Sequence, residues 1–182
     1  MPASHIALLR GINVGGNNKV PMAELRAALT ASGLADVSTY IQSGNVLFRT
    51  SEPDTAVLEE AIAEVIARTF GIKIGVVVLT RDQLAAVLSA NPYPDEPNPK
   101  YVHVVFLGAA PDAGRLDAAR EMAAAKGSRD TVTAGDRVLY LHTPDGYGTS
   151  ELAKALVKVT TSAKGTARNL STTAKLLALC DE

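Results

Sequence analysis

Apolar and polar positions along this chain follow the two periods of regular secondary structure, about 3.6 residues for helices and two for strands. Short apolar or β-branched runs bounded by turn residues predict strands, and apolar residues three or four positions apart predict helices. The first half has these predicted elements: a strand at 5–10, a helix from Pro21, strands at 37–42 and 46–49 around Gly44-Asn45, a helix from Pro53 that stops before Gly71, and a strand at 72–79. Its expected order is therefore β-α-β-β-α-β.

The second half repeats this order. Its predicted elements are a strand at 101–107, a helix from Pro111 to Ala124, strands at 131–134 and 138–141 around Gly135-Asp136, and a helix that Ser150 caps. Two β-α-β-β-α units in tandem are a simpler arrangement than one irregular fold. We expect residues 1–90 to form the first unit with a connecting helix, residues 91–100 a proline-rich linker, and residues 101–182 the second unit with a C-terminal helix.

Composition indicates a globular protein with an aliphatic core. The 182 residues are 47% hydrophobic but only 4% aromatic, with no Trp, and this length can bury a core without disulfides. Cys180 is the single cysteine, the N-terminus lacks the pattern of a signal peptide, and no apolar run reaches the length of a membrane span. These features predict a cytoplasmic protein with no membrane partner. A net charge of −1 excludes a globally basic nucleic-acid binder, although not a local basic patch.

The connection between the first strand and the first helix is the most informative segment. From Gly11 to Pro21 it is seven residues longer than its counterpart from Gly108 to Pro111. Loop length beyond what a fold requires more often serves binding than stability. The segment is rich in Gly and Asn and leads to a helix N-terminus, a combination that can present backbone N–H groups to an anion. The alternative is a turn-rich loop whose asparagines adopt left-handed conformations.

This loop contains part of a phosphate-binding motif. Gly11 and Gly16 have the G-x-x-x-x-G spacing, but two asparagines replace the Lys-Ser/Thr pair that would reach phosphate and magnesium. A nucleoside triphosphatase is therefore disfavoured. We expect a looser anion site with charge from Arg10 and Lys19.

Topology predicts a second segment beside the loop. In a β-α-β-β unit with a right-handed crossover the first two strands run the same way, so the loop and the following hairpin share one edge of the sheet. The hairpin has a purely structural alternative, because Gly-Asn is favourable turn chemistry. The predicted ligand-binding residues of these two segments are Arg10, Asn13, Gly15, Gly16, Asn17, Lys19, Gln42, Ser43 and Asn45.

A basic stretch near the C-terminus adds further candidates. It contains Lys154, Lys158, Lys164, Arg168 and Lys175. Asn169 or Ser171 is expected to cap the last helix. Arg168, Asn169 and Lys175 join the predicted ligand site if that helix folds back to the loop; otherwise the stretch is a solvated helix face.

Residues for catalysis, metal binding or a known cofactor are not identifiable. His5, His103 and His142 lack the spacing of a metal site, and structural roles are expected for them. No nucleophile motif or paired-carboxylate motif occurs, and Cys180 is interpreted as a packing residue. The catalytic residues and the cofactor, if any, stay unknown from the sequence.

Several of these motifs together resemble the bacterial family called domain of unknown function 1697. The resemblance rests on residues 7–16 and 19–22, 40–46, 103–107 and 166–176, and it covers essentially the whole chain. It implies a cytosolic α+β protein built by tandem duplication of a ferredoxin-like β-α-β-β-α(-β) unit, with mainly antiparallel sheets and a C-terminal helix. It implies no reaction or cofactor. Leu170 stands where the family typically has an aromatic residue, and we interpret this position as a packing site rather than a lost base-stacking platform.

Three functional hypotheses follow from these features. The leading one is a binding protein that holds a small anionic ligand, such as a nucleotide or phosphorylated metabolite, between the first loop and the hairpin. The second is an enzyme, a transferase or hydrolase, in which the same residues stabilise negative charge on a phosphate-containing substrate. The third is an RNA-associated protein that uses the C-terminal basic stretch.

Overall fold

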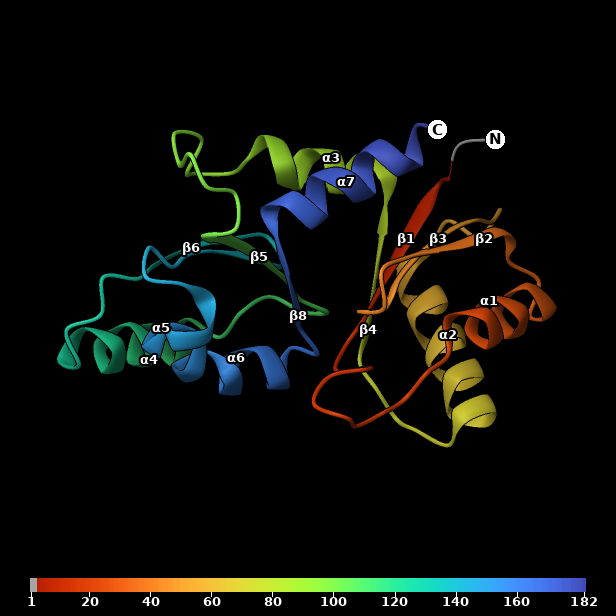
Figure 1. The fold of residues 1–182 in the computed structure, drawn as a ribbon, viewed down its shortest axis with the longest axis horizontal. Coiled ribbons are helices and arrows are strands. Elements are labelled where there is room, and N and C mark those ends of the chain that lie inside the picture. Colours follow the sequence, from red (N-terminus) through yellow and green to blue (C-terminus); the bar gives the residue numbers. More distant parts are fainter. Residues whose placement is uncertain (1–2) are drawn as a thin grey trace. The chain divides into compact units, whose positions relative to one another are not determined.

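The computed structural model describes residues 3–182, which form two compact units. Residues up to Ala86 and Lys175–Glu182 belong to the first unit, and Val87–Ala174 form the second. Each unit contains a four-stranded antiparallel sheet with flanking helices (Figure 1). The predicted α+β fold, a tandem duplication of a ferredoxin-like unit followed by a C-terminal helix, is confirmed.

The first unit follows the predicted order of elements. They are β1 (His5–Leu9), α1 (Met22–Ala31), β2 (Ala35–Tyr40), β3 (Asn45–Arg49), α2 (Thr55–Phe70), β4 (Val76–Thr80) and the start of α3 (Arg81–Ser89). Asp54 caps α2 by accepting a hydrogen bond from the Ala56 N–H, and Gly71 ends that helix with a φ of 69°. The strand order is β2-β3-β1-β4.

The second unit repeats this arrangement with one strand that the sequence analysis missed. Its elements are β5 (Val102–Phe106), α4 (Ala113–Ala125), β6 (Thr131–Gly135), β7 (Val138–His142), α5 (Glu151–Ala155), α6 (Val157–Ser162), β8 (Thr166–Asn169) and the start of α7 (Leu170–Cys180). The strand order β6-β7-β5-β8 is that of the first sheet, with β8 in the place of β4. Duplication therefore extends to the last strand of each unit.

Both hairpin turns lie one residue or more from their predicted positions. Residues 41–44 connect β2 to β3, so Asn45 is the first residue of a strand and not part of the turn. In the second unit Asp136 and Arg137 form the turn, and Arg137 takes a φ of 52°. In the first hairpin Gly44 has the positive φ expected of it, 81°, and Ile41 at the start of the turn has one as well, 51°.

One face of each sheet packs against the helices of its own unit. In the first unit Leu9, Phe48 and Val78 join the buried residues of α1 and α2 in one cluster. In the second unit Val105 and Leu139 belong to the equivalent cluster with residues of α4, α5 and α6. These aliphatic cores fix the sheets, and thereby the strand ends from which the connecting loops emerge.

The proline-rich segment 91–100 has specific contacts within the second unit. The Tyr93 hydroxyl lies 2.9 Å from Thr131 Oγ1, and the Tyr93 ring stacks on His142 with centroids 5.1 Å apart. Glu96 Oε2 lies 2.6 Å from His142 Nε2. The segment is thus attached to strands β6 and β7 by side-chain contacts.

Candidate functional site

The long connection after β1 forms a miniature hairpin. Val14 and Asn17 pair as an isolated antiparallel bridge, and the Asn17 N–H donates to the Val14 carbonyl at 3.1 Å. Gly15 and Gly16 form the turn with φ values of 59° and 80°, which is the conformation of a two-residue hairpin turn that requires glycine or asparagine. Both glycines are exposed, so the tip presents backbone to solvent.

Asn13 fixes the base of this hairpin. Its Oδ1 accepts a hydrogen bond from the Val20 N–H at 2.9 Å, and its Nδ2 donates to the carbonyls of Val20 at 3.0 Å and Gln42 at 2.9 Å. Asn18 adds a bond from its Nδ2 to the Gly11 carbonyl at 3.0 Å. Asn13 and Asn18 both have left-handed φ values, as the turn-rich alternative anticipated. The amide of Asn13 therefore positions the loop.

The predicted proximity of the loop and the β2-β3 hairpin is confirmed. Both β1 and β2 pair antiparallel with β3, so they run the same way and end at the same edge. Besides the Asn13–Gln42 bond, the Leu9 N–H donates to the Gly44 carbonyl at 2.8 Å. A Cβ on Gly44 would lie 2.7 Å from Leu9 Cβ, so only glycine allows the hairpin this close to β1.

The side chain of Asn45 stabilises the turn between β2 and β3. Its side chain is fully buried, and its Nδ2 donates to the Tyr40 carbonyl and to Ser43 Oγ, each at 3.0 Å. Gln42 is exposed and Ser43 is half-buried. Of the predicted hairpin residues, Gln42 thus presents its side chain to solvent, whereas the Asn45 amide stabilises the turn.

A third segment reaches the same edge and was missed by the sequence analysis. The Arg10 N–H donates to the Gly75 carbonyl at 2.9 Å, because β4 pairs with β1. We call residues 10–20, 41–45 and 71–75 together the loop edge. It contains the three cations Arg10, Lys19 and Lys73 and no Asp, Glu or His. The sequence analysis included Lys73 in the predicted strand at 72–79 and did not consider it as a site residue, whereas β4 begins at Val76 and Lys73 is exposed in the segment before it.

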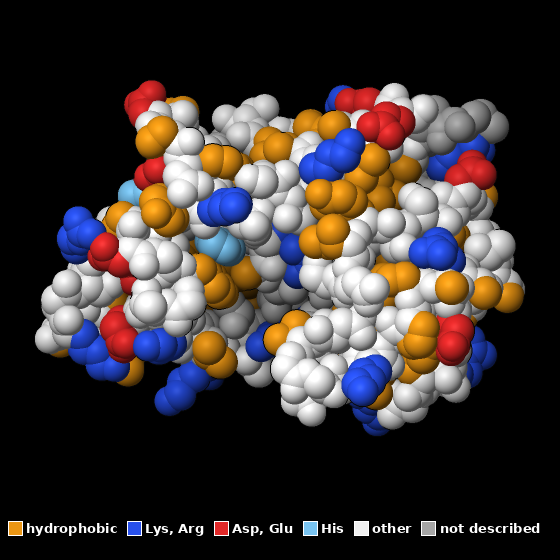
Figure 2. All heavy atoms as spheres, viewed as in Figure 1, with side chains coloured by type: hydrophobic (Ala, Val, Ile, Leu, Met, Phe, Trp, Pro, Cys, Tyr) orange, Lys and Arg blue, Asp and Glu red, His pale blue; other side chains and the backbone are white. Residues whose placement is uncertain are grey.

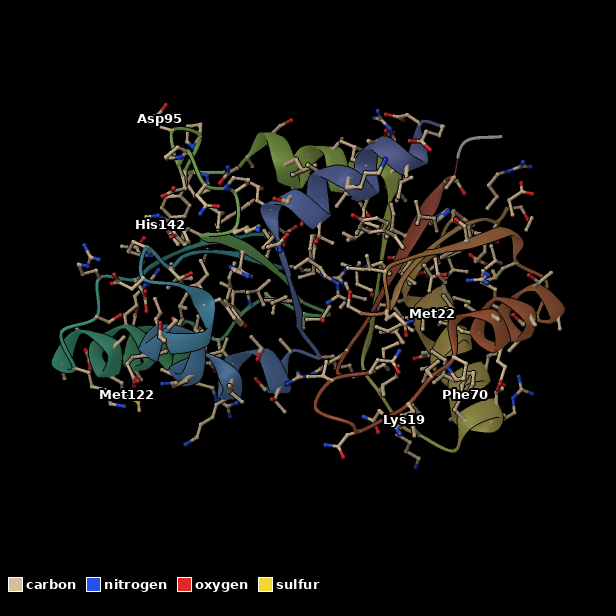
Figure 3. The ribbon with its side chains drawn as sticks, viewed as in Figure 1. Lys19, Met22, Phe70, Asp95, Met122 and His142 are labelled. Atoms are coloured by element: carbon tan, nitrogen blue, oxygen red, sulfur yellow. The ribbon has the colours of Figure 1, made fainter. Side chains whose placement is uncertain are left out.

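The loop edge is visible in the side-chain and surface views. Figure 3 shows Lys19 on the connection between β1 and α1, at the lower end of the first unit. Figure 2 shows Lys and Arg side chains at this end of the unit. Lys19 and Lys73 are exposed, and Arg10 is half-buried.

The C-terminal candidates are divided between the two units. Arg168 lies in β8 with 8% of its surface exposed, and its Nη1 donates to Thr166 Oγ1 and to the Ala167 carbonyl, each at 2.8 Å. Burial lowers the pKa of Arg168 to about 10, which still leaves it charged at neutral pH.

Asn169 Oδ1 accepts a hydrogen bond from the Thr172 N–H at 2.8 Å and caps α7, as predicted. Lys175 Nζ lies 3.3 Å from Glu182 Oε1. Their participation in the ligand site stays a prediction.

The other reactive side chains have structural surroundings. Cys180 is fully buried, and burial raises the pKa of its thiol to about 11, so the thiol is neutral at physiological pH. His5 is buried beside Phe48, and this burial lowers its pKa. Neither residue has the surroundings of a nucleophile or a general base poised near neutral pH.

We expect His103 to make the stability of the fold depend on pH. It stacks on Tyr147 with centroids 4.1 Å apart, and burial lowers its pKa from 6.5 to about 4. Between these values the unfolded chain binds a proton that the folded chain does not, so the free energy of unfolding falls as the pH falls. We expect His103 to contribute a loss of roughly 1 to 2 kcal/mol between about pH 7 and pH 4, since its partial exposure reduces the full effect.

Urea unfolding at several pH values checks this expectation. His103→Gln should flatten the pH dependence relative to the wild type, because glutamine does not titrate. His5 and Glu96, whose pKa values are also lowered in the folded chain, are present in both proteins, so their contributions cancel in the comparison. An unchanged slope in the variant would show that His103 is not the titrating group.

No helix in residues 3–182 combines the length and the apolar character needed to cross a membrane.

The chain is similar to a known protein family and to a solved structure. A family model described as "Protein of unknown function (DUF1697)" matches residues 3–140. The solved structure of the conserved bacterial protein SP0830 from Streptococcus pneumoniae is similar over 99% of both chains, with 27% sequence identity and a TM-score of 0.73. A comparison with curated proteins gives no match.

Proposed function

Because this chain belongs to the DUF1697 family of proteins of unknown function, we propose its function from the loop edge: it binds a small phosphate-bearing anion there, such as a nucleotide or phosphorylated metabolite. The main observation behind the proposal is the positive charge of the loop edge. Three segments that are distant in sequence meet at one end of the first sheet and bring Arg10, Lys19 and Lys73 without a carboxylate among them. Cations gathered at one edge of a sheet raise the local concentration of anions and stabilise a bound phosphate.

The backbone of the loop supports the same proposal. Gly15 and Gly16 lack side chains at an exposed turn, and a Cβ at either position would have no atom within 4 Å. A ligand can therefore approach the peptide groups of the turn closely. The three hydrogen bonds of Asn13 hold this turn in place before the ligand arrives, which reduces the entropic cost of binding.

Ligand binding without catalysis is the simpler function for the residues of the loop edge. General acid–base catalysis needs a side chain that exchanges a proton near neutral pH, usually His, Asp or Glu. The loop edge contains none of the three residue types. Its amides, glycines and cations are suited to recognising negative charge.

Isothermal titration calorimetry with ADP, inorganic phosphate and adenosine tests the proposal. We expect ADP and phosphate to bind and adenosine, which lacks phosphate, not to bind. Arg10→Ala, Lys19→Ala and Lys73→Ala should each weaken ADP binding about tenfold, since a charge-assisted contact contributes about 1.5 kcal/mol or more. Lys100→Ala removes an exposed cation of the second unit and serves as the matched control.

Two outcomes would contradict the proposal. One is ADP binding that the triple variant of Arg10, Lys19 and Lys73 retains at wild-type affinity. The other is equal affinity for adenosine and ADP, which would show that phosphate is not recognised. Native mass spectrometry of freshly purified protein would complement the titration by identifying a retained phosphate-containing molecule.

A further inference from the structure

The second unit has an apolar groove on its helical side. The groove runs between α4 and the α5–α6 pair, has a volume of about 660 Å³, and is lined by residues that include Arg115, Ala118, Met122, Ala155, Val157 and Lys158. Met122 and Val157 are 58% and 54% exposed, which is unusual for large apolar side chains. Figure 3 shows Met122 on the outer side of α4.

The sequence explains why the groove exists. In the first unit one continuous helix, α2, packs beside α1, and its Leu58 and Ile62 are buried. In the second unit that helix is interrupted at Leu156, between the short helices α5 and α6. Facing them, α4 presents alanines, which are too small to fill the space that a Leu or Ile would occupy.

The lining of the groove is suited to a helix. Small side chains of α4 and of the α5–α6 pair line it, and Met122 and Val157 lie on different helices. A helix is about 10 Å wide with its side chains, so it can cover both residues at once. The charged residues of the lining are Arg115 and Lys158, both cationic. The complementary helix therefore has small apolar residues flanked by carboxylates.

The outer face of α2 in the first unit has this composition. Val57, Glu60, Ala61 and Glu64 are exposed at the i, i+3, i+4 and i+7 positions of one helical stripe. Val57 is 49% exposed. The stripe spans the same number of residues as the groove-lining stretch Arg115–Met122 of α4, about 10 Å of helix in each case. Length, apolar content and charge all match.

We propose that the groove of one molecule binds the α2 face of a second copy of this chain. The contact is heterologous, because the two copies use different surfaces. Apolar contact occurs between Val57 and Ala61 of one copy and Met122 and Val157 of the other, and Glu60 and Glu64 face Arg115 and Lys158. A single helix in a groove is smaller than a standard interface, so the association is weak, with a Kd of roughly 100 μM. It does not depend on anion binding at the loop edge.

Sedimentation velocity of the full chain, from about 10 μM to about 1 mM, tests the proposal. The wild type should show a weight-average sedimentation coefficient that rises with concentration. Lys158→Glu and Glu64→Lys should each weaken association at least fivefold, and the double variant should return to within about twofold of the wild type. Both side chains are exposed, and thermal unfolding checks that the variants fold.

Lys100→Glu is the control, because it makes the same charge change at an exposed site of the second unit outside the groove lining. It should leave association unchanged. A chain that stays monomeric to 1 mM would overturn the proposal, and so would association that Lys158→Glu leaves unchanged. Failure of the double variant to recover would show that Lys158 and Glu64 do not face each other, and the proposed pairing would be wrong.

Discussion

Gly44→Ala is expected to lower the free energy of unfolding by about 3 to 5 kcal/mol, because it combines backbone strain with overpacking. Gly44 has a φ of 81°, in the left-handed region that other residues adopt at a cost. An added Cβ would also lie 2.7 Å from Leu9 Cβ and 2.9 Å from Ile12 Cδ1, and both neighbours are fully or almost fully buried. The hairpin must then move away from β1. Urea unfolding at neutral pH measures the loss.

Gly16→Ala is the matched control for Gly44→Ala. Gly16 has almost the same φ, 80°, but an added Cβ there would have no atom within 4 Å. Its cost should be that of the left-handed backbone alone, about 1 to 2 kcal/mol. Equal losses for the two variants would show that the close approach of the hairpin to β1 does not contribute to stability.

Asn13→Ala is expected to cost about 2 to 3 kcal/mol. The substitution removes three hydrogen bonds, to the Val20 N–H, the Val20 carbonyl and the Gln42 carbonyl, each contributing about 1 kcal/mol. It also removes an asparagine from a φ of 53°, a conformation that asparagine tolerates better than alanine. Because Asn13 joins the loop to the hairpin, amide hydrogen exchange at residues 13–18 should accelerate as well.

Asn18→Ala is the comparison that isolates the role of Asn13. Asn18 has a similar φ of 47° but makes one side-chain hydrogen bond to a backbone carbonyl, that of Gly11, within the loop itself. Both variants share the backbone cost, so the difference between them reports the additional hydrogen bonds. We expect Asn13→Ala to be the more destabilising by about 1 to 2 kcal/mol in chemical unfolding. If the two losses coincide, the loop and the hairpin are not held together by Asn13.

The sequence predicted most elements because their boundaries have local causes. Gly71, expected after the end of a helix, adopts the left-handed conformation that ends α2, and Ser150 caps α5 as expected. Strand β8 was missed because Thr166–Asn169 is largely polar and has no apolar alternation. Its pairing with β5 depends on residues 60 or more positions away, which local periodicity cannot show. The repeat alone could have indicated it, since the first unit also ends in a strand.

Part of the candidate site was also predictable. The direction of the strands was enough to place the β1-α1 loop beside the β2-β3 hairpin. The role of Asn13 was not, because its partners Val20 and Gln42 meet only in the folded unit. Asn45 was expected in a turn with an available side chain, but Ile41 takes a left-handed φ of 51° and the turn falls earlier, which leaves Asn45 buried in β3.

The loop edge as an anion site is tested most directly by an amide NMR titration of the isotopically labelled chain with ADP. Anion binding at the loop edge should give chemical-shift changes that saturate and are largest at residues 10–20, 41–45 and 71–75, with the Gly15 and Gly16 amides among the most affected. Repeating the titration with Arg10→Ala should reduce these changes at each ADP concentration. Saturable changes located elsewhere, with residues 10–20 unaffected, would show that the loop edge is not the anion site.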